Sequence, residues 1–203
     1  MRRLWILVGA MGLALAAEPA FAGKLQFSPD TFEIYGGLAN SPTKGSTKRT
    51  RKISYSGAKT VDFKSDLAPG SILVRTYDKK LYFILPNGKA IEYVVGVGRE
   101  GFTWSGRNKI SRKAVWPDWR PPAVMIEREA ANGHYIPDYM PGGPDNPLGA
   151  RALYIGDTEF RIHGTAQPWT IGGNVSSGCI RMLNEEVIDL YDRAKVGALV
   201  VVE

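Results

Sequence analysis

Cysteine and histidine are scarce in this chain, whose 203 residues contain one cysteine, Cys179, and two histidines, His134 and His163. A lone cysteine cannot form an intramolecular disulfide, so Cys179 is either a free thiol or one half of an intermolecular bridge. A third interpretation is a small buried apolar side chain. The glycine- and serine-rich segment around Cys179 argues against it, because few apolar neighbours are at hand. The sequence thus favours a thiol with a chemical purpose.

Long apolar runs are also missing, except at the start of the chain. Two arginines follow Met1, residues 4–17 are apolar, and Ala20-Phe21-Ala22 comes next. This order is typical of a signal peptide with its cleavage site, so we expect a signal peptide over 1–22 and an exported mature chain that begins at Gly23. The alternative is an uncleaved anchor, but a spanning helix needs about 20 apolar residues. We therefore expect no stable membrane span after cleavage.

Acidic residues are absent from the segment 40–52, which carries five of the basic residues in a chain of net charge +6. Residues 23–68 also have poor hydrophobic periodicity and many turn residues, so we predict a basic, flexible N-terminal extension there. The alternative for the basic residues is a loose attraction to an anionic surface such as cell wall or lipid headgroups. Because we expect export, we expect no nucleic-acid partner.

The remaining residues, 69–203, form one predicted domain that is mainly β with one or two short helices. An Asn-Gly turn at 86–89 lies between two apolar runs, which is typical of a β-hairpin. A proline start predicts a helix over 121–130, and Asn184 is the predicted N-cap of a second helix that ends near Ala194. The predicted strands are 71–77, 80–85, 90–98, 148–156, 159–163 and 198–202.

Two groups of side chains have open interpretations. The loop 132–147 is rich in proline and glycine, and we interpret its His134 as a surface residue, with substrate binding as the alternative. Trp104, Trp116 and Trp119 lie among glycines, prolines and charges. We favour packing for these tryptophans over a platform on which sugars stack.

The segment 161–181 holds the parts of a thiol active site. His163 ends a predicted strand, and a loop of 15 residues separates it from Cys179. An imidazole that touches a thiol can take its proton and later protonate a leaving amine. The backbone N–H groups of Ser177, Gly178 and Cys179 could then form an oxyanion hole.

The chain resembles a known family in these residues. His163-Gly164-Thr165, Ser176 to Met182 and the following 184–191 are similar to the catalytic domain of YkuD-type L,D-transpeptidases. The resemblance covers 69–203 and implies the mixed β or β-sandwich architecture of that family. It also implies a periplasmic enzyme of peptidoglycan, without cofactor or metal.

The resemblance further implies the roles of individual residues. Cys179 is the nucleophile that attacks the third residue of a donor tetrapeptide stem, releases D-alanine and holds the acyl group as a thioester. His163 is the base and then the acid, and the carbonyl of Gly164 orients its ring. An amine, usually from the third residue of a second stem, then takes the acyl group.

Several site residues remain open. Ser177 stands where many family members have histidine, and we expect activity to survive because that position contributes mainly its backbone amide. Arg181 either holds a substrate carboxylate or belongs to a structural ion pair. Trp169 either lines the cleft or packs, and Thr165 is a further candidate for substrate contact.

Other functions fit parts of the same pattern. Transfer of the acyl group to water would make the protein an L,D-carboxypeptidase, and transfer to a lysine or N-terminal amine of an outer-membrane protein would tether that protein to the wall. A catalytically inactive wall-binding module is the alternative from another class. The presence of both Cys179 and His163 argues against it.

Overall fold

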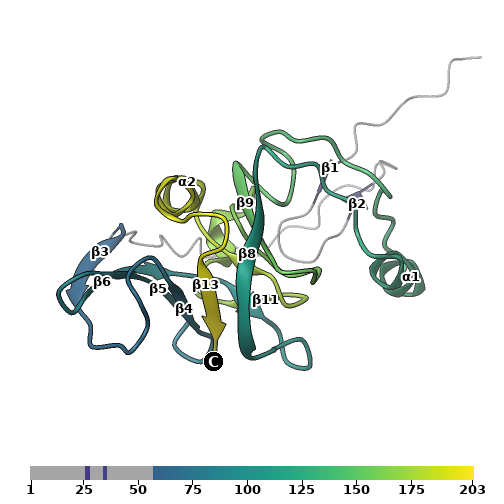
Figure 1. Ribbon diagram of the computed structural model, residues 1–203. Coiled ribbons are helices and arrows are strands. Elements are labelled where there is room, and N and C mark those ends of the chain that lie inside the picture. Colours follow the sequence, from purple (N-terminus) through teal and green to yellow (C-terminus); the bar gives the residue numbers. More distant parts are fainter. Residues whose placement is uncertain (1–25, 28–33, 36–56) are drawn as a thin grey trace, which may run out of the picture.

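The computed structural model describes residues 57–203 and, ahead of them, the paired strands β1 (Gln26–Phe27) and β2 (Ile34–Tyr35) (Figure 1). The predicted signal peptide over 1–22 and the basic residues of 40–52 lie outside the described residues. Within that part of the chain, no helix is long and apolar enough to cross a membrane.

A curled sheet of nine strands forms the body of the molecule (Figure 1). Across the sheet the order is β12-β10-β9-β8-β13-β4-β5-β6-β3. The pairs β13–β4 and β10–β12 are parallel and the others are antiparallel. The strands are β3 (Lys59–Asp62), β4 (Ile72–Arg75), β5 (Lys80–Leu85), β6 (Lys89–Val94), β8 (Gly106–Val115), β9 (Arg151–Ile155), β10 (Arg161–His163), β12 (Ile180–Arg181) and β13 (Leu199–Val202). Two further strands, β7 (Val97–Gly98) and β11 (Asn174–Ser176), pair in parallel beside it.

The predicted hairpin is confirmed. Strands β5 and β6 pair antiparallel from Lys80 opposite Val94 to Leu85 opposite Lys89. The turn places Asn87 at φ 60 and Gly88 at φ 67. The register leaves three residues in the loop, Pro86, Asn87 and Gly88, and asparagine and glycine are the residues that most readily take the positive φ found there.

The main core lies between the sheet and helix α2 (Asn184–Arg193). Val187 and Leu190 form the buried side of α2 and are fully inaccessible to solvent. They join apolar side chains from β4, β5, β6, β8, β9, β10, β12 and β13. Strands β10 and β12 therefore share one packed core with the rest of the sheet, which fixes their positions relative to each other.

A second apolar cluster covers the other face of β4, β5 and β6, and it changes the predicted boundary of the domain. Val61, Phe63 and Leu67 pack against this cluster, and β3 pairs with β6. These residues fall inside the segment 23–68 that we predicted to be a flexible extension. Residues 59–67 therefore pack on the sheet, ahead of the predicted boundary at Pro69.

The helices agree with the prediction in place but not in every detail. Helix α1 (Ala123–Ala131) confirms the proline-initiated helix. The N-cap of α2 is Leu183 and not Asn184, whose side chain bonds elsewhere. Strand β8, the longest strand of the sheet, was not predicted because its charged sequence shows little alternation of apolar residues.

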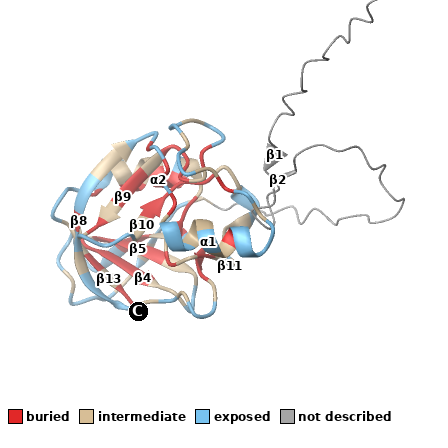
Figure 2. Cartoon of the chain, turned by 90° about the vertical axis from the view of Figure 1, so that its right-hand side faces the viewer, coloured by how far each residue is buried: buried red, intermediate tan, exposed pale blue. Residues whose placement is uncertain are grey.

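Helix α1 lies apart from α2, on another side of the sheet (Figures 1 and 2). Figure 2 shows its largely exposed outer surface in front of buried strands. A small apolar cluster supports it, in which Met125 and Ile126 pack against Trp119, Ile136 and Leu148. This helix and its flanking loops form one wall of the site described next.

Candidate active site

The pairing of β10 with β12 brings His163 and Cys179 together. The two strands run parallel, with Ile162 opposite Ile180 and His163 opposite Arg181. Cys179 directly precedes β12, and extending the same register by one residue places it beside Arg161, the first residue of β10. Side chains alternate between the faces of a strand, so these two pairs share one face and form a square of four residues.

The opposite face of the two strands explains why the square is held firmly. Ile162 and Ile180 point into the main core and are at most 1% exposed. A shift of one residue in register would move these apolar side chains out of the core and the polar ones into it. Apolar packing on one face therefore fixes the reactive side chains on the other.

A cavity of about 170 Å³ opens over the square. His163, Cys179, Arg161 and Arg181 all line it, together with Ser176 and Ser177 from the turn ahead of the cysteine. Its remaining polar wall consists of Arg99, Arg128, Glu129 and Glu159. Four arginines against two glutamates give the cavity a net positive charge, which suits a substrate with carboxylates.

His163 is buried, and its ring is fixed in one orientation. Nδ1 lies 2.6 Å from the carbonyl oxygen of Gly164, so Nδ1 carries the proton and donates it to that oxygen. The pKa of His163 is lowered to about 3, chiefly by burial and then by the charge of Arg181, while the hydrogen bond to Gly164 opposes both. The imidazole is therefore neutral at pH 7, with Nε2 free of a proton and able to act as a base.

Cys179 is half-buried, and its resting form is the thiol. Burial raises the pKa of Cys179 above its ordinary value. The charges of Arg161 and Arg181 oppose this rise, as do hydrogen bonds from the backbone and side chain of Arg161. The thiol also lies 3.8 Å from the carbonyl oxygen of Glu159. Since His163 is neutral too, the resting pair carries no charge.

The turn before Cys179 is held by its own hydroxyl group. Ser176 Oγ donates to the carbonyl of Cys179 at 2.6 Å and accepts from the amide of Gly178 at 3.1 Å. Trp104 stacks on Phe160 and donates to the carbonyl of Gly178 at 2.9 Å. Because the Gly178 amide is already bonded to Ser176, its predicted place in an oxyanion hole is not supported by this geometry. The amides of Ser177 and Cys179 are the candidates that remain.

Asn184 organises the loop after His163, a role that the sequence did not reveal. Its Oδ1 accepts from the amides of Ala150 at 2.9 Å and Thr165 at 3.2 Å, and its Nδ2 donates to the Thr165 carbonyl at 3.1 Å. A Cβ added at Gly164 would overlap Asn184 Oδ1. Glycine is needed there because the amide side chain lies against its backbone, and this fixes the carbonyl that orients His163.

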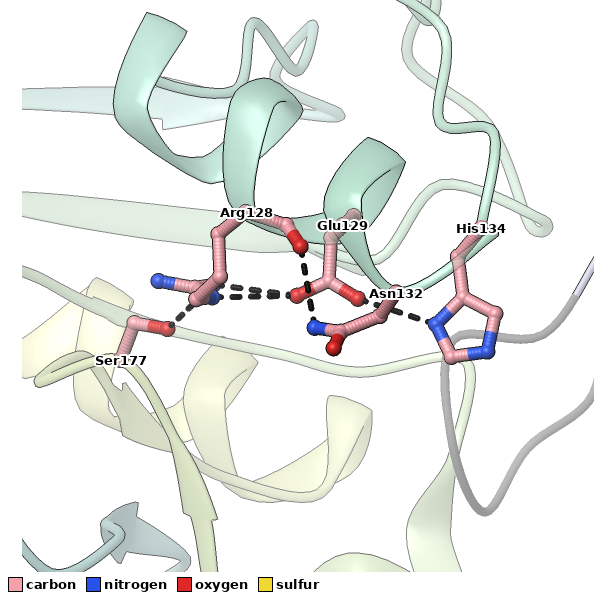
Figure 3. Close-up of polar contacts among 5 residues, drawn as sticks. All are labelled: Arg128, Glu129, Asn132, His134 and Ser177. Atoms are coloured by element: carbon pink, nitrogen blue, oxygen red, sulfur yellow. Dashed lines mark hydrogen bonds and ion pairs between the residues drawn. The ribbon is translucent and has the colours of Figure 1, made fainter.

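Helix α1 contacts the cysteine turn through Arg128, as Figure 3 shows. Its guanidinium bonds Glu129 Oε1 through Nε and Nη2, both at 3.2 Å, and Nη2 lies 3.5 Å from Ser177 Oγ. Glu129 Oε2 faces His134 Nδ1 at 3.3 Å. His134 therefore supports the buried Glu129 and does not line the cavity.

The other predicted contact residues have different surroundings. Arg181 lines the cavity, is buried, and lies 3.5 Å from Gln167 Oε1 through Nη1. Thr165 is buried, and its Oγ1 accepts from the amide of Gln167, so it holds the turn and does not line the cavity. Trp169 is 45% exposed on the short 3-10 helix Pro168–Thr170 and also lies outside the cavity lining.

Trp104, Trp116 and Trp119 divide between packing and exposure. Trp119 is buried in the cluster under α1, and Trp104 packs beside the cysteine turn. Trp116 is 43% exposed. Among the residues that the structure describes, no three His, Cys, Asp or Glu side chains gather as a metal site would require.

Comparison with known proteins agrees with this architecture. The profile of the YkuD family, described as an L,D-transpeptidase catalytic domain, matches residues 69–202. The Escherichia coli protein named "Probable L,D-transpeptidase YbiS" is 36% identical over 141 residues, which cover 66% of this chain and 45% of that protein. "Probable L,D-transpeptidase ErfK/SrfK" of the same species is 35% identical over 139 residues, covering 66% and 44%. The chain thus spans less than half the length of these relatives.

Solved structures share the fold. A mutant of the Enterococcus faecium L,D-transpeptidase has a TM-score of 0.52 at 17% identity, over 68% of this chain and 50% of that one. A Brucella melitensis structure described as a probable carnitine operon oxidoreductase has a TM-score of 0.50 at 43% identity, over 72% and 93%. With the family profile matched along most of the described residues, the chain belongs to the YkuD family of L,D-transpeptidase catalytic domains.

Proposed function

We propose that this protein is a cysteine-dependent L,D-transpeptidase of peptidoglycan. The observation that carries the proposal is that the β10–β12 pairing brings His163, at the end of β10, and Cys179, just before β12, to the lining of one cavity. Hydrogen bonding fixes the imidazole, and the turn beside the thiol offers backbone amides for an oxyanion. Family membership supplies the reaction class, and the positively charged cavity suits peptide stems that carry carboxylates.

Acylation begins with transfer of the thiol proton from Cys179 to Nε2 of His163. The thiolate attacks the carbonyl carbon of the third residue of a donor tetrapeptide stem. The amides of Ser177 and Cys179 then stabilise the oxyanion. Collapse of the tetrahedral intermediate breaks the C–N bond to the terminal D-alanine, whose nitrogen takes the proton from His163. The products of this half are free D-alanine and a thioester on Cys179.

Deacylation reverses these roles. The side-chain amine of a second stem's third residue attacks the thioester and gives its proton to His163, and the carbon–sulfur bond breaks. The thiolate recovers the proton as the amide cross-link forms. Water in place of the amine would make the protein an L,D-carboxypeptidase, and a protein amine would tether an outer-membrane protein to the wall. The products of the assay described below distinguish these three acceptors.

The cellular setting follows from the substrate. Peptidoglycan lies outside the cytoplasmic membrane, which agrees with a signal peptide over 1–22 and a periplasmic mature protein. We assign catalysis to 69–203 and, because β3 packs on the sheet, include residues from Lys59 onward in the folded unit. An inactive wall-binding module would have no use for a neutral imidazole beside a thiol in a cavity.

The test is to incubate the mature protein with disaccharide-tetrapeptides and resolve the products by mass spectrometry. Cross-linked dimers that have lost one alanine support transfer, and tripeptide monomers alone indicate hydrolysis. C179A is expected to form neither product and no acyl adduct, while it unfolds at the same temperature as the wild type. Absence of any adduct on Cys179 in a folded wild-type protein would refute the enzyme proposal.

A further inference from the structure

Arg161 is a cavity residue whose place beside the cysteine comes directly from the sheet register. Arg161 precedes Ile162 on β10, Cys179 comes just before Ile180 at the start of β12, and Ile162 and Ile180 are paired. Both side chains therefore leave their strands on the same face as neighbours, and both line the cavity. His163 is the next residue of β10 on this face, so the arginine flanks both members of the reacting pair.

The guanidinium of Arg161 is held in place and partly desolvated. Its Nε is buried, with no hydrogen-bond partner among the described groups. Its Cζ lies 5.4 Å from the centre of the Tyr154 ring. Arg112, on the neighbouring strand β8, also lies over the Tyr154 ring, with its Cζ 3.6 Å from the ring centre. One aromatic side chain thus supports two arginines, of which only Arg161 lines the cavity.

The site needs such a cation because its resting state is uncharged. Deprotonation of Cys179 puts a negative charge on a half-buried sulfur atom, and burial disfavours that charge. Proton transfer to His163 creates a positive charge on a buried ring, which burial also disfavours. A fixed cation beside the sulfur stabilises the thiolate without itself giving or taking a proton, because arginine stays charged.

We propose that Arg161 is the positioning residue that stabilises the Cys179 thiolate, both before attack on the donor and when the thiolate leaves the thioester. This role rests on the proposed function of Cys179 as nucleophile. The S–H bond breaks and its proton passes to His163 Nε2, while the guanidinium offers N–H groups and charge to the sulfur. The imidazole then serves chiefly as a proton carrier.

Other charged groups also face the sulfur, and the design of the test allows for them. Arg181 lies on β12, two residues after Cys179, and is paired with His163. Four more charged residues line the cavity from other segments, namely Arg99, Arg128, Glu129 and Glu159. Of these charged residues, Arg161 is the one that the extended β10–β12 register places beside the cysteine. Its replacement should therefore have the largest effect on the thiol.

The experiment measures the rate at which iodoacetamide alkylates the protein between about pH 5 and pH 11, a range that spans ordinary thiol titration. Cys179 is the only cysteine of the chain, so the intact mass reports this thiol alone. In R161Q we expect the midpoint of the curve of alkylation rate against pH to rise by about one pH unit or more, with about tenfold slower alkylation near neutral pH. R161K, which keeps the charge, should recover most of the loss.

R112Q is the matched control. It removes the same charge from the same tyrosine ring, but Arg112 is exposed and does not line the cavity. We expect its midpoint to equal that of the wild type. R161M keeps an apolar stem against Tyr154 and gives a second neutral variant should R161Q fail to fold. A neutral variant with the wild-type midpoint, or an equal shift in R112Q, would overturn the proposal.

Parallel assays with disaccharide-tetrapeptides separate this proposal from the proposed function. A shift of the midpoint in a protein that never forms an acyl adduct would leave the role of Arg161 intact and refute the transpeptidase. Normal turnover by R161Q with an unchanged midpoint would leave the transpeptidase proposal intact and refute the role of Arg161. A loss of kcat that R161K restores, with equal KM, is the kinetic result expected of a residue that acts on the thiolate.

Discussion

Arg128 Nη2 lies 3.5 Å from Ser177 Oγ and joins helix α1 to the turn that carries Cys179. The same guanidinium holds Glu129, which faces His134 at the end of the helix (Figure 3). Two segments that are far apart in the sequence thus form facing walls of one cavity. The serine side chain makes this contact, while its backbone amide is left for the proposed oxyanion.

Because the side chain and the backbone amide of Ser177 have separate contacts, we predict that Ser177→Ala keeps most of the activity. The variant retains the backbone amide and loses one long hydrogen bond, so kcat should fall by less than about fivefold, as expected for a neutral bond worth roughly 1 kcal/mol or less. The measurement is the rate of D-alanine release. Removal of an oxyanion donor typically costs about a hundredfold or more, so a loss of that size would mean that the hydroxyl itself contacts the reacting carbonyl.

We call the three hydrogen bonds from the Asn184 side chain to Ala150 and Thr165 the Asn184 clamp. The clamp predicts that Asn184→Ala loses more stability than removal of a helix cap would cost. Asn184→Ala leaves two backbone amides and one carbonyl without their side-chain partners, which should lower the free energy of unfolding by about 2 to 4 kcal/mol. Urea denaturation measures the change. The control is Asn132→Ala, whose exposed side chain bonds only the Arg128 carbonyl of its own helix and should cost less than about 1 kcal/mol.

If Asn184→Ala and Asn132→Ala cost the same, the clamp does not hold the loop. Activity offers a second readout, because the clamp lies against Gly164, whose carbonyl orients His163. We expect kcat to fall in Asn184→Ala even under conditions where the variant is fully folded.

The sequence predicted those parts of the fold that depend on local signals. The Asn-Gly turn, the β5–β6 hairpin and the two helices have turn residues or apolar periodicity of their own. Strand β8 was missed because it is sandwiched between β9 and β13, and its neighbours rather than its own sequence make it a strand. Asn184 was misread as a cap because its true partners, at Ala150 and Thr165, are distant in the chain.

The same limit applies to the site. Cys179 and His163 could be predicted because they are rare and occur in a recognisable motif. Arg161 and Arg128 could not, because one depends on strand register and the other on the position of a separate helix. Knowledge of the β10–β12 register alone would have placed Arg161 beside the thiol.

The depressed pKa of His163 predicts a link between pH and stability. In the folded protein the pKa is about 3, below its ordinary value, so the unfolded chain binds the proton more tightly. This contribution to stability is fully present above about pH 6.5 and is lost as the pH falls towards the folded value. Within that window the slope is about 1.4 kcal/mol per pH unit for one proton.

His163→Gln removes this titration while it keeps a side-chain amide that can donate to Gly164. The free energy of unfolding from urea titrations should fall less steeply in the variant between about pH 6 and pH 4 than in the wild type. Other groups titrate alike in both proteins, so the difference isolates His163. Parallel curves would mean that folding does not lower the pKa of His163, which would contradict its burial as a neutral imidazole.

An alanine substitution at Gly178 tests whether a steric clash at the active-site turn costs more than backbone strain alone. Its φ is +109, and a Cβ there would overlap the ring of Phe160, which stacks on Trp104. Gly70 has φ +90 with nothing within 4 Å of the same position, so it is a control with similar strain and no clash. Gly70→Ala should cost about 1 to 2 kcal/mol and leave activity unchanged. Gly178→Ala should cost more and abolish acylation, because the new Cβ would push the Cys179 turn away from the Phe160 ring, which stacks on the tryptophan that bonds the Gly178 carbonyl. Equal losses of stability with retained acylation in both variants would show that the turn tolerates a side chain and that the Phe160 contact does not fix the nucleophile.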